Sequence, residues 1–286
     1  AICIIQDAVG SGLAAAFGLN PLLGLCMGSM PLVGGHGTSG SFGPLLETDY
    51  AVVGATTVAL AAATYGLVSG SMMGGPIARA RVEKLHLKST AAEEGNETAE
   101  VMPAVDGQKF TTSAMFLAVA IGLGTLIFTF FKDVCHLTFP TYIGAMLAAA
   151  AIRNIWDVQN KDLPMVEIDA LGGLSLNLFL SMAMMSLKLW QLAALALPMI
   201  VILLVQTVVM FLYANFVVFN VMGRDYEAAA MTTAFCGFGM GATPNAMANM
   251  RALVERYGAA PRAFFIVPLV GSLFVDFFNS MVLTTF

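Results

Sequence analysis

The chain has little charge. Only 11% of its 286 residues are Asp, Glu, Lys or Arg, whereas 58% are hydrophobic, and the mean hydropathy is +0.81. A soluble domain needs a more strongly charged surface than this composition provides. The scarcity of charge therefore argues against a soluble protein. It indicates an integral membrane protein whose main surroundings are the lipid bilayer, and we expect no nucleic-acid partner.

Paired cysteines and a signal-peptide start are also absent. The four cysteines show no CxxC spacing, so we expect no redox role, no organic cofactor and no metal site other than one for Na⁺. The chain opens on the apolar AICIIQDAVG, which has neither Met nor a basic residue. We therefore expect an incomplete N-terminus, and the apolar ending SMVLTTF suggests the same of the C-terminus.

Long apolar runs are present instead. A helix needs about 20 apolar residues to cross the hydrocarbon core of a bilayer, which is ~30 Å thick. Segments that approach or exceed this length lie at 1–19, 50–75, 112–131, 139–152, 171–187, 191–222 and 263–286. The sequence therefore predicts an all-α, multi-pass membrane fold. A polar stretch at 78–110, which mixes both charges with Pro and Gly, predicts a mobile linker between two halves.

Basic residues orient the chain, because loops rich in Lys and Arg remain in the cytoplasm. If the linker at 78–110 is cytoplasmic, Lys132 and Lys188 fall outside and all other Lys and Arg residues fall inside. This bias predicts a cytoplasmic linker.

The two halves repeat one pattern in the same order. IIQDAV at 4–9 resembles LVQTVV at 204–209, and each is followed by a glycine-rich break, GGHGTSG at 34–40 and GFGMGATPNAMANM at 237–250. The predicted orientation places the first break on the outer side and the second on the inner side. The repeats are therefore predicted to be inverted.

Each break belongs to a segment too short to cross the bilayer. A helical limb of about 12 residues reaches only ~18 Å, so we expect re-entrant hairpins at about 21–46 and 228–252. Residues 1–77 would then be the C-terminal part of a truncated first repeat, and residues 111–286 the second repeat. Inverted repeats with broken helices are typical of secondary transporters, which bind their substrates at the breaks.

The hairpin tips carry the candidate substrate-binding residues. Helix N-termini attract anions, and glycines allow a ligand close to the backbone. His36 can donate a hydrogen bond to a carboxylate or titrate during transport, although a structural hydrogen bond is the alternative role. For the other candidates, helix packing or interhelical hydrogen bonding is the alternative. The candidates are Gly35, His36, Gly37, Thr38, Ser39, Gly241, Thr243, Asn245 and Asn249.

Polar residues within or beside the apolar spans are candidates for Na⁺ coordination. Asp7 and Asp276 are expected to be intramembrane carboxylates, which cost several kcal/mol if they are left unpaired. The full set of Na⁺ candidates is Asp7, Ser41, Ser175, Asn177, Gly239, Asp276 and Asn279. Gln6 and Gln206 occupy equivalent places in the two repeats, and Pro244 interrupts the helical hydrogen bonds. We expect these three residues to brace the hairpins.

In their order along the chain these motifs resemble the sodium/glutamate symporter family. The matching segments are QDAVG, LNPLLGL, GGHGT, GGPIAR, FPTY, LSLNLFLSMAMMSLKLW, LALPMIVILLVQT and CGFGMGATPNAMANM with ERYG. The resemblance implies Na⁺-coupled uptake of L-glutamate across the bacterial inner membrane, by two inverted five-helix repeats in a homodimer. Val33 and Asn245 stand where the family pattern has Ser and Thr, which leaves the exact substrate open.

The resulting hypothesis is an elevator-like carrier, not an enzyme, in which a core with both hairpin tips moves against a dimerising scaffold. Na⁺ would be the coupling ion. The alternatives are a Na⁺-coupled carrier for another carboxylate or amino acid, a channel, and an intramembrane aspartyl protease built on Asp7 and Asp276. No GxGD motif supports the protease.

Overall fold

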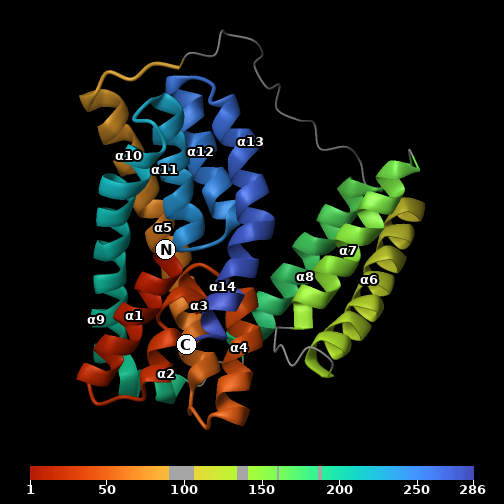
Figure 1. Ribbon diagram of the computed structural model, residues 1–286, viewed down its shortest axis with the longest axis horizontal. Coiled ribbons are helices and arrows are strands. Elements are labelled where there is room, and N and C mark those ends of the chain that lie inside the picture. Colours follow the sequence, from red (N-terminus) through yellow and green to blue (C-terminus); the bar gives the residue numbers. More distant parts are fainter. Residues whose placement is uncertain (90–105, 134–140, 160, 186–188) are drawn as a thin grey trace. The chain divides into compact units, whose positions relative to one another are not determined.

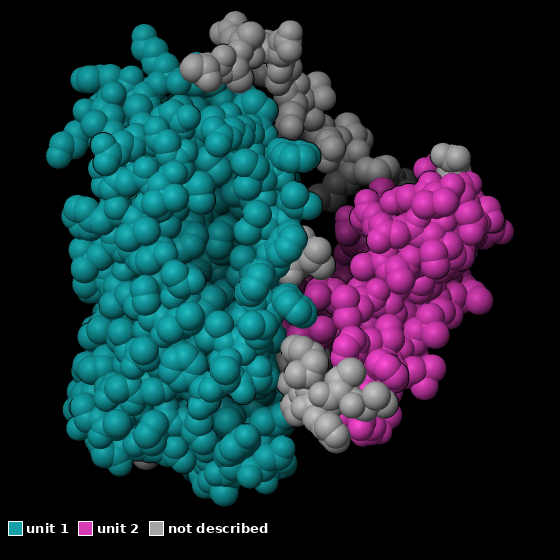
Figure 2. Space-filling view, in the orientation of Figure 1, with its two compact units in different colours: residues 1–94, 187–286 teal, residues 95–186 magenta. Residues whose placement is uncertain are grey.

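The computed structural model describes residues 1–89, 106–133, 141–159, 161–185 and 189–286. All regular secondary structure in these ranges is helical, which confirms the predicted all-α class. The chain divides into two compact units, which Figure 2 shows in different colours. Unit 1 consists of residues 1–94 and 187–286, and unit 2 consists of residues 95–186.

Unit 1 combines the beginning and the end of the chain (Figure 1). Its helices are α1 (Ile2–Ala16), α2 (Pro21–Leu25), α3 (Ser29–Leu32), α4 (Gly35–Asp49), α5 (Ala55–Lys84), α9 (Leu189–Tyr213), α10 (Phe219–Val221), α11 (Tyr226–Gly239), α12 (Thr243–Tyr257), α13 (Pro261–Leu269) and α14 (Asp276–Leu283). Two π-helical turns complete it: η1 (Ala214–Val218) precedes α10, and η2 (Val270–Val275) precedes α14.

Unit 2 contains α6 (Gly107–Asp133), α7 (Thr141–Val158) and α8 (Met165–Met185). Gly124 and Gly144 let the backbones of α6 and α7 approach closely, since a Cβ on either glycine would collide with the other helix. The rings of Phe116 and Trp156 meet edge to face, with centroids 5.1 Å apart. Small residues at such crossings are typical of helices that pack within a membrane.

Three described helical stretches are long and apolar enough to cross a membrane: Ala55–Lys84, Gly107–Asp133 and Leu195–Val221. They coincide with predicted spans, whereas the other predicted spans fall on α1, α7, α8 and the α13 to α14 stretch. Helix α5 continues to Lys84, so the first residues of the predicted linker at 78–110 are helical. Residues 90–105 of that linker lie outside the described residues.

Both glycine-rich stretches contain a helix break. Val33 and Gly34 separate α3 from α4, and residues 240–242 separate α11 from α12. The first stretch was expected to be unwound from Gly34 onward, but Gly35 already begins a helix that runs to Asp49. The breaks are therefore shorter than the glycine content suggests, and most of the predicted tip residues lie in the first turns of helices.

Helix α5 is the element against which the second break packs. A Cβ on Gly66 would collide with the carbonyl oxygen of Met240, and one on Gly70 would lie 2.9 Å from the carbonyl oxygen of Cys236. Residues four apart lie on one face of a helix, and Gly74 extends the same face by one more turn. The bare backbone of α5 thus forms a groove for the end of α11.

The C-terminal end of α5 is fastened to η1. The Arg81 guanidinium donates from Nη2 to the backbone oxygen of Asn215, 2.9 Å away, and stacks over the ring of Phe219 at 4.8 Å. A π-helical turn disrupts the regular pairing of backbone groups in a helix. Arg81 therefore satisfies a carbonyl group in that turn and holds α5 beside α9 and α10.

Candidate functional site

The two helix breaks meet in the interior of unit 1. A Cβ placed on Gly35 would lie 3.0 Å from the carbonyl oxygen of Gly241, so the two backbones are almost in contact. Gly35 also has a φ of +62°, a conformation that favours glycine. In Figure 1 the α2 to α4 segment and the α11–α12 pair approach this meeting point from opposite ends of unit 1. The structure thus brings together the two sequence stretches predicted to form the site.

Two helix N-termini lie at the meeting point. Helix α4 begins at Gly35 and α12 begins at Thr243, and neither N-cap residue, Gly34 or Ala242, provides a side-chain cap. The first N–H groups of a helix have no partner within it, and they carry a partial positive charge. Two such ends beside one another create a region that favours an anion.

The hydroxyl groups of the first tip are mostly committed to the α4 backbone. Ser39 Oγ donates to the carbonyl oxygen of Gly35 at 2.7 Å, and Ser41 Oγ donates to that of Gly37 at 3.1 Å. Ser39 and Thr38 are buried, whereas Gly37 is exposed, and a Cβ added to it would meet nothing within 4 Å. A ligand at this tip therefore meets backbone groups at Gly35 to Gly37 before it meets these side chains.

His36 is fixed by α5. Its Nε2 lies 3.0 Å from Thr64 Oγ1, and the Thr64 hydroxyl in turn donates to the carbonyl oxygen of Leu60 at 3.0 Å. Because that hydroxyl proton is already used, Nε2 of His36 must carry the proton of their hydrogen bond. This assigns His36 at least one structural contact and leaves its Nδ1 for another role.

Asn245 and Asn249 point toward α5. Asn245 Nδ2 donates to the carbonyl oxygen of Leu67 at 3.1 Å, and its Oδ1 accepts a hydrogen bond from Ser71 Oγ. Asn249 is buried, and its Nδ2 donates to the carbonyl oxygen of Gly70 at 3.2 Å. Both amides are therefore engaged in interhelical hydrogen bonds, which was the alternative role for these residues.

Thr243 and Pro244 open α12. Thr243 is half-buried beside Gly271 of η2, where an added Cβ would lie 3.1 Å from Thr243 Oγ1. Pro244 occupies the first turn of α12, where its missing N–H costs no helical bond; its side chain lies outside the described residues. The η2 turn thus borders the second tip.

The two glutamines form a connected pair. Gln206 Nε2 on α9 donates to the backbone oxygen of Gln6 at 2.7 Å, and Gln6 Nε2 on α1 donates to that of Gly239 at 3.0 Å. Both side chains are fully buried. The end of α11 is thereby linked through α1 to α9, which is the arrangement that bracing of a hairpin requires.

Ser29, which the sequence did not single out, joins three elements. Its backbone N–H and its hydroxyl donate to the two carboxylate oxygens of Asp7 at 2.7 and 2.8 Å, and its carbonyl oxygen accepts from Asn279 Nδ2 at 3.2 Å. All three residues are fully buried. Asp7 therefore stabilises the start of the first break, and Oδ1 of Asn279 has no partner among the described residues.

The remaining Na⁺ candidates are dispersed. Asp276 directly follows η2 and is half-buried, and the described part of the chain offers it no hydrogen bond. Ser175 and Asn177 lie on α8 of unit 2, where both are exposed. Their membership of one site with the candidates of unit 1 stays a prediction.

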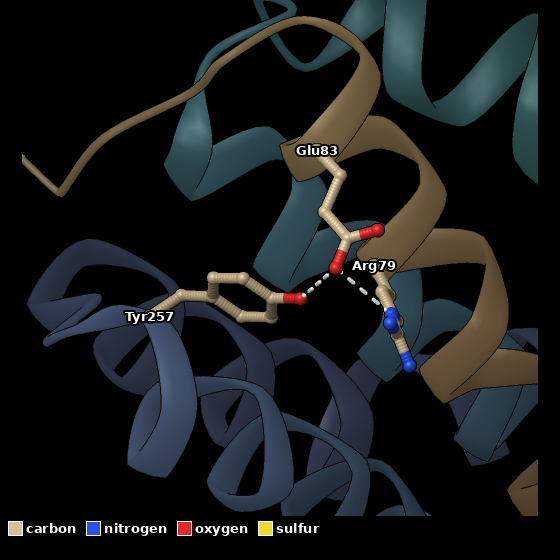
Figure 3. A network of polar contacts seen from close by, with 3 residues as sticks. All are labelled: Arg79, Glu83 and Tyr257. Carbon is tan, nitrogen blue, oxygen red and sulfur yellow. Dashed lines mark hydrogen bonds and ion pairs between the residues drawn. The ribbon is translucent and has the colours of Figure 1, made fainter.

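Polar contacts join the open end of the α11–α12 pair to α5. Figure 3 shows Glu83, whose Oε1 accepts from Arg79 Nε at 2.9 Å and from the hydroxyl of Tyr257 at 2.8 Å. Nearby, Tyr226 donates to the carbonyl oxygen of Gly258, and burial raises the pKa of its phenol to about 12. Tyr226 therefore remains a neutral hydrogen-bond donor at physiological pH.

Residues on α5 that the sequence reasoning missed contact both tips. Thr64 and Ser71 supply hydroxyls, and Gly66, Gly70 and Gly74 supply the close approach. The signal that could have found them is the regular spacing of glycines in GLVSGSMMG, a pattern of small residues four apart that marks helix contacts in membranes.

An all-helical membrane protein with two broken helices meeting in its interior has the features of the secondary-transporter class. The model of one known family, described as sodium/glutamate symporter, matches residues 1–259. The chain belongs to the sodium/glutamate symporter family.

Individual relatives agree with this assignment. The sodium/glutamate symporter of Escherichia coli strain K12 is 40% identical over an alignment of 289 positions that covers 99% of this chain and 72% of that protein. The sodium/glutamate symporter of Haemophilus influenzae is 35% identical over 97% of this chain and 70% of its own length. No solved structure matches the chain.

Proposed function

We propose that this protein carries L-glutamate together with Na⁺ across the bacterial inner membrane. The observation that carries the proposal is the meeting of two helix N-termini without side-chain caps, those of α4 and α12, with Gly35 against Gly241. Such a pair of helix ends suits a substrate with two carboxylate groups. The names of the curated relatives support glutamate as that substrate.

The substrate would contact the two tips mainly through backbone N–H groups. On the first tip these belong to Gly35, His36 and Gly37, with Thr38 and Ser39 behind them. On the second tip Gly241 and Thr243 lie at the helix break, whereas Asn245 and Asn249 support the site by attaching α12 to α5. The exposed Gly37 marks the place where a ligand reaches the first tip without displacing a side chain.

Sodium would balance the charge of the substrate. The tip stretches 34–41 and 239–249 contain no Lys or Arg, so the protein offers no fixed cation there. Within unit 1, oxygen ligands for Na⁺ would come from the carboxylates of Asp7 and Asp276, the amide of Asn279, the hydroxyl of Ser41 and the backbone at Gly239. Of these, Asn279 offers a buried oxygen that has no partner in the described structure. Ser175 and Asn177 of unit 2 are separate Na⁺ candidates.

The transport cycle would follow an elevator mechanism in a homodimer. In this proposal the α2 to α4 segment and the α11–α12 pair are re-entrant hairpins of two inverted repeats, and they move together past a dimerising scaffold. The opposite approach of the two segments supports the inversion (Figure 1).

Uptake of radiolabelled glutamate into proteoliposomes tests the function. With an inward Na⁺ gradient we expect saturable accumulation of glutamate. Replacement of the Na⁺ gradient by an equal K⁺ gradient should abolish this accumulation. Accumulation that is independent of Na⁺ would overturn the proposal. So would glutamate flux that shows no saturation, which is the behaviour of a channel. Competition by aspartate and by uncharged amino acids separates a glutamate carrier from a carrier for another carboxylate or amino acid.

The protease alternative gains nothing from the geometry. Ser29 occupies both carboxylate oxygens of Asp7, and within the described residues no hydrogen bond joins Asp7 to Asp276. Paired catalytic carboxylates need to share a site and a proton.

A further inference from the structure

Both helix tips are attached to one helix, α5, by hydrogen bonds that lie close together along it. The first tip is attached where His36 donates to Thr64, at 3.0 Å. The second tip is attached where Asn245 donates to the carbonyl oxygen of Leu67, at 3.1 Å. Thr64 and Leu67 are three residues apart, which is ~4.5 Å along a helix axis.

Further contacts continue away from this point in both directions along α5. Toward its N-terminal end, the carboxylate of Glu47 at the foot of α4 accepts from the backbone N–H of Thr56 at 3.0 Å. Toward its C-terminal end, Asn249 donates to the carbonyl oxygen of Gly70 at 3.2 Å. The α2 to α4 segment thus packs along the first half of α5 and the α11–α12 pair along the second half, and the change from one to the other falls at the level of the tips.

Gly66 lies at this change. A Cβ there would lie 3.0 Å from the Leu32 side chain, which precedes the first break, and would collide with the carbonyl oxygen of Met240 in the second. Both breaks therefore pack against the same turn of α5.

From this geometry we infer that Asn245 and Asn249, together with Ser71 and Thr64, are positioning residues that set the spacing between the N-termini of α4 and α12. The inference rests on the proposed function, because the spacing affects transport only if the two helix ends bind the two carboxylates of the substrate. Two anion-binding helix ends at a fixed separation discriminate between dicarboxylates by length. Loosening the attachment of α12 weakens glutamate binding and reduces discrimination against aspartate, which is one methylene shorter.

Asn249→Asp tests the attachment. The substitution preserves the shape of the side chain but removes the amide donor that serves the carbonyl oxygens of Gly70 on α5 and Thr233 on α11. Asn220→Asp is the matched control, because Asn220 also donates its amide to a helix carbonyl, that of Phe216, but is exposed and far along the chain from either tip. Ser71→Ala is a milder variant that removes the hydroxyl which donates to Asn245 Oδ1 and, within α5, to the carbonyl oxygen of Leu67.

In Na⁺-driven uptake we expect Asn249→Asp to raise the KM for glutamate about ten-fold, as the loss of a buried hydrogen bond predicts, with kcat changed less than about two-fold. In competition assays, the preference for glutamate over aspartate should decrease in the same variant. Ser71→Ala should show the same changes to a smaller degree. An unchanged KM and an unchanged preference in both variants would overturn the inference.

A distance measurement keeps the inference testable apart from transport. Spin labels at Thr48→Cys on α4 and Ala248→Cys on α12, both exposed positions, are placed in a background without the native cysteines. Pulsed electron paramagnetic resonance should give one narrow distribution of the distance between the two spin labels. Asn249→Asp should broaden this distribution, whereas Asn220→Asp should not. Distance distributions of equal width in the unsubstituted protein, Asn249→Asp and Asn220→Asp would overturn the inference even if glutamate uptake is normal. If Asn249→Asp broadens the distribution but the unsubstituted protein takes up no glutamate, only the proposed function is overturned.

Discussion

At the scale of single residues, Ser29 shows how one small side chain can join distant parts of the chain. It begins the short helix α3, and it contacts Asp7 on α1 and Asn279 on α14. The Asp7 carboxylate is fully buried, so its hydrogen bonds from Ser29 offset part of the cost of removing a charged group from water.

Ser29→Ala removes the hydroxyl that donates to Asp7 Oδ2 while the backbone donor remains. We expect the free energy of unfolding to fall by about 1.5 to 3 kcal/mol, the usual contribution of a hydrogen bond to a charged group. Denaturant titration in detergent, followed by circular dichroism, measures the loss. Ser181→Ala is the control, because Ser181 is exposed and donates only within α8; equal stability of both variants would contradict this account of Asp7.

At the scale of elements, α5 combines the length of a membrane-spanning helix with glycines that weaken a helix. It is long enough to cross a membrane, and it also carries glycines, which weaken a helix by about 1 kcal/mol each relative to alanine. The cost is offset where another backbone occupies the space, as Cys236 and Met240 do beside Gly70 and Gly66.

Gly70→Ala should therefore destabilise the protein, although alanine is the better helix former. The added Cβ would lie 2.9 Å from the carbonyl oxygen of Cys236, and overpacking of this kind costs about 1 to 3 kcal/mol. Gly75→Ala on the same helix has nothing within 4 Å of the new Cβ and should be neutral or slightly stabilising. Midpoints of thermal unfolding in detergent compare the two, and a Gly70→Ala midpoint at or above that of Gly75→Ala would refute the packing argument.

At the scale of the whole molecule, the proposed substrate site belongs to neither break alone. It would depend on two segments that are some two hundred positions apart in sequence and that both pack on α5. Access of water and ligand to the exposed Gly37 reports directly on this meeting point.

Gly37→Cys, in a background without native cysteines, should react with a water-soluble thiol reagent, and glutamate with Na⁺ should slow the reaction several-fold by occupying the tip. Glutamate alone or Na⁺ alone should slow the reaction of the thiol at position 37 less than both together, since each neutralises the charge of the other in the site. Thr48→Cys, exposed at the foot of the same helix, should react at the same rate under all conditions. Equal rates at position 37 with and without both ligands would place the substrate elsewhere.

The sequence by itself determined the helical membrane fold, the family and the two stretches that form the tips. These follow from local properties: apolar length fixes which segments suit a membrane, and runs of glycine with proline mark helix breaks whatever surrounds them. Gln6 and Gln206 stood out in the sequence by their equivalent positions in the two repeats, whereas their contact, a hydrogen bond of 2.7 Å from Gln206 Nε2 to the backbone oxygen of Gln6, is a finding of the structure.

Only the tertiary structure decided which way the polar side chains of those stretches face. Asn245 has the same residue type and the same sequence neighbours whether it points at a ligand or at α5, and its direction is set by the carbonyl group of Leu67 and the hydroxyl of Ser71 that lie beside it. The same holds for the length of the breaks, because Ser39 and Ser41 can support either an unwound loop or, as observed, the first turns of a helix. A hydrogen-bond partner far away in sequence leaves no local pattern, so the contacts of Ser29 with Asp7 and Asn279 could be recognised only once the helices were packed.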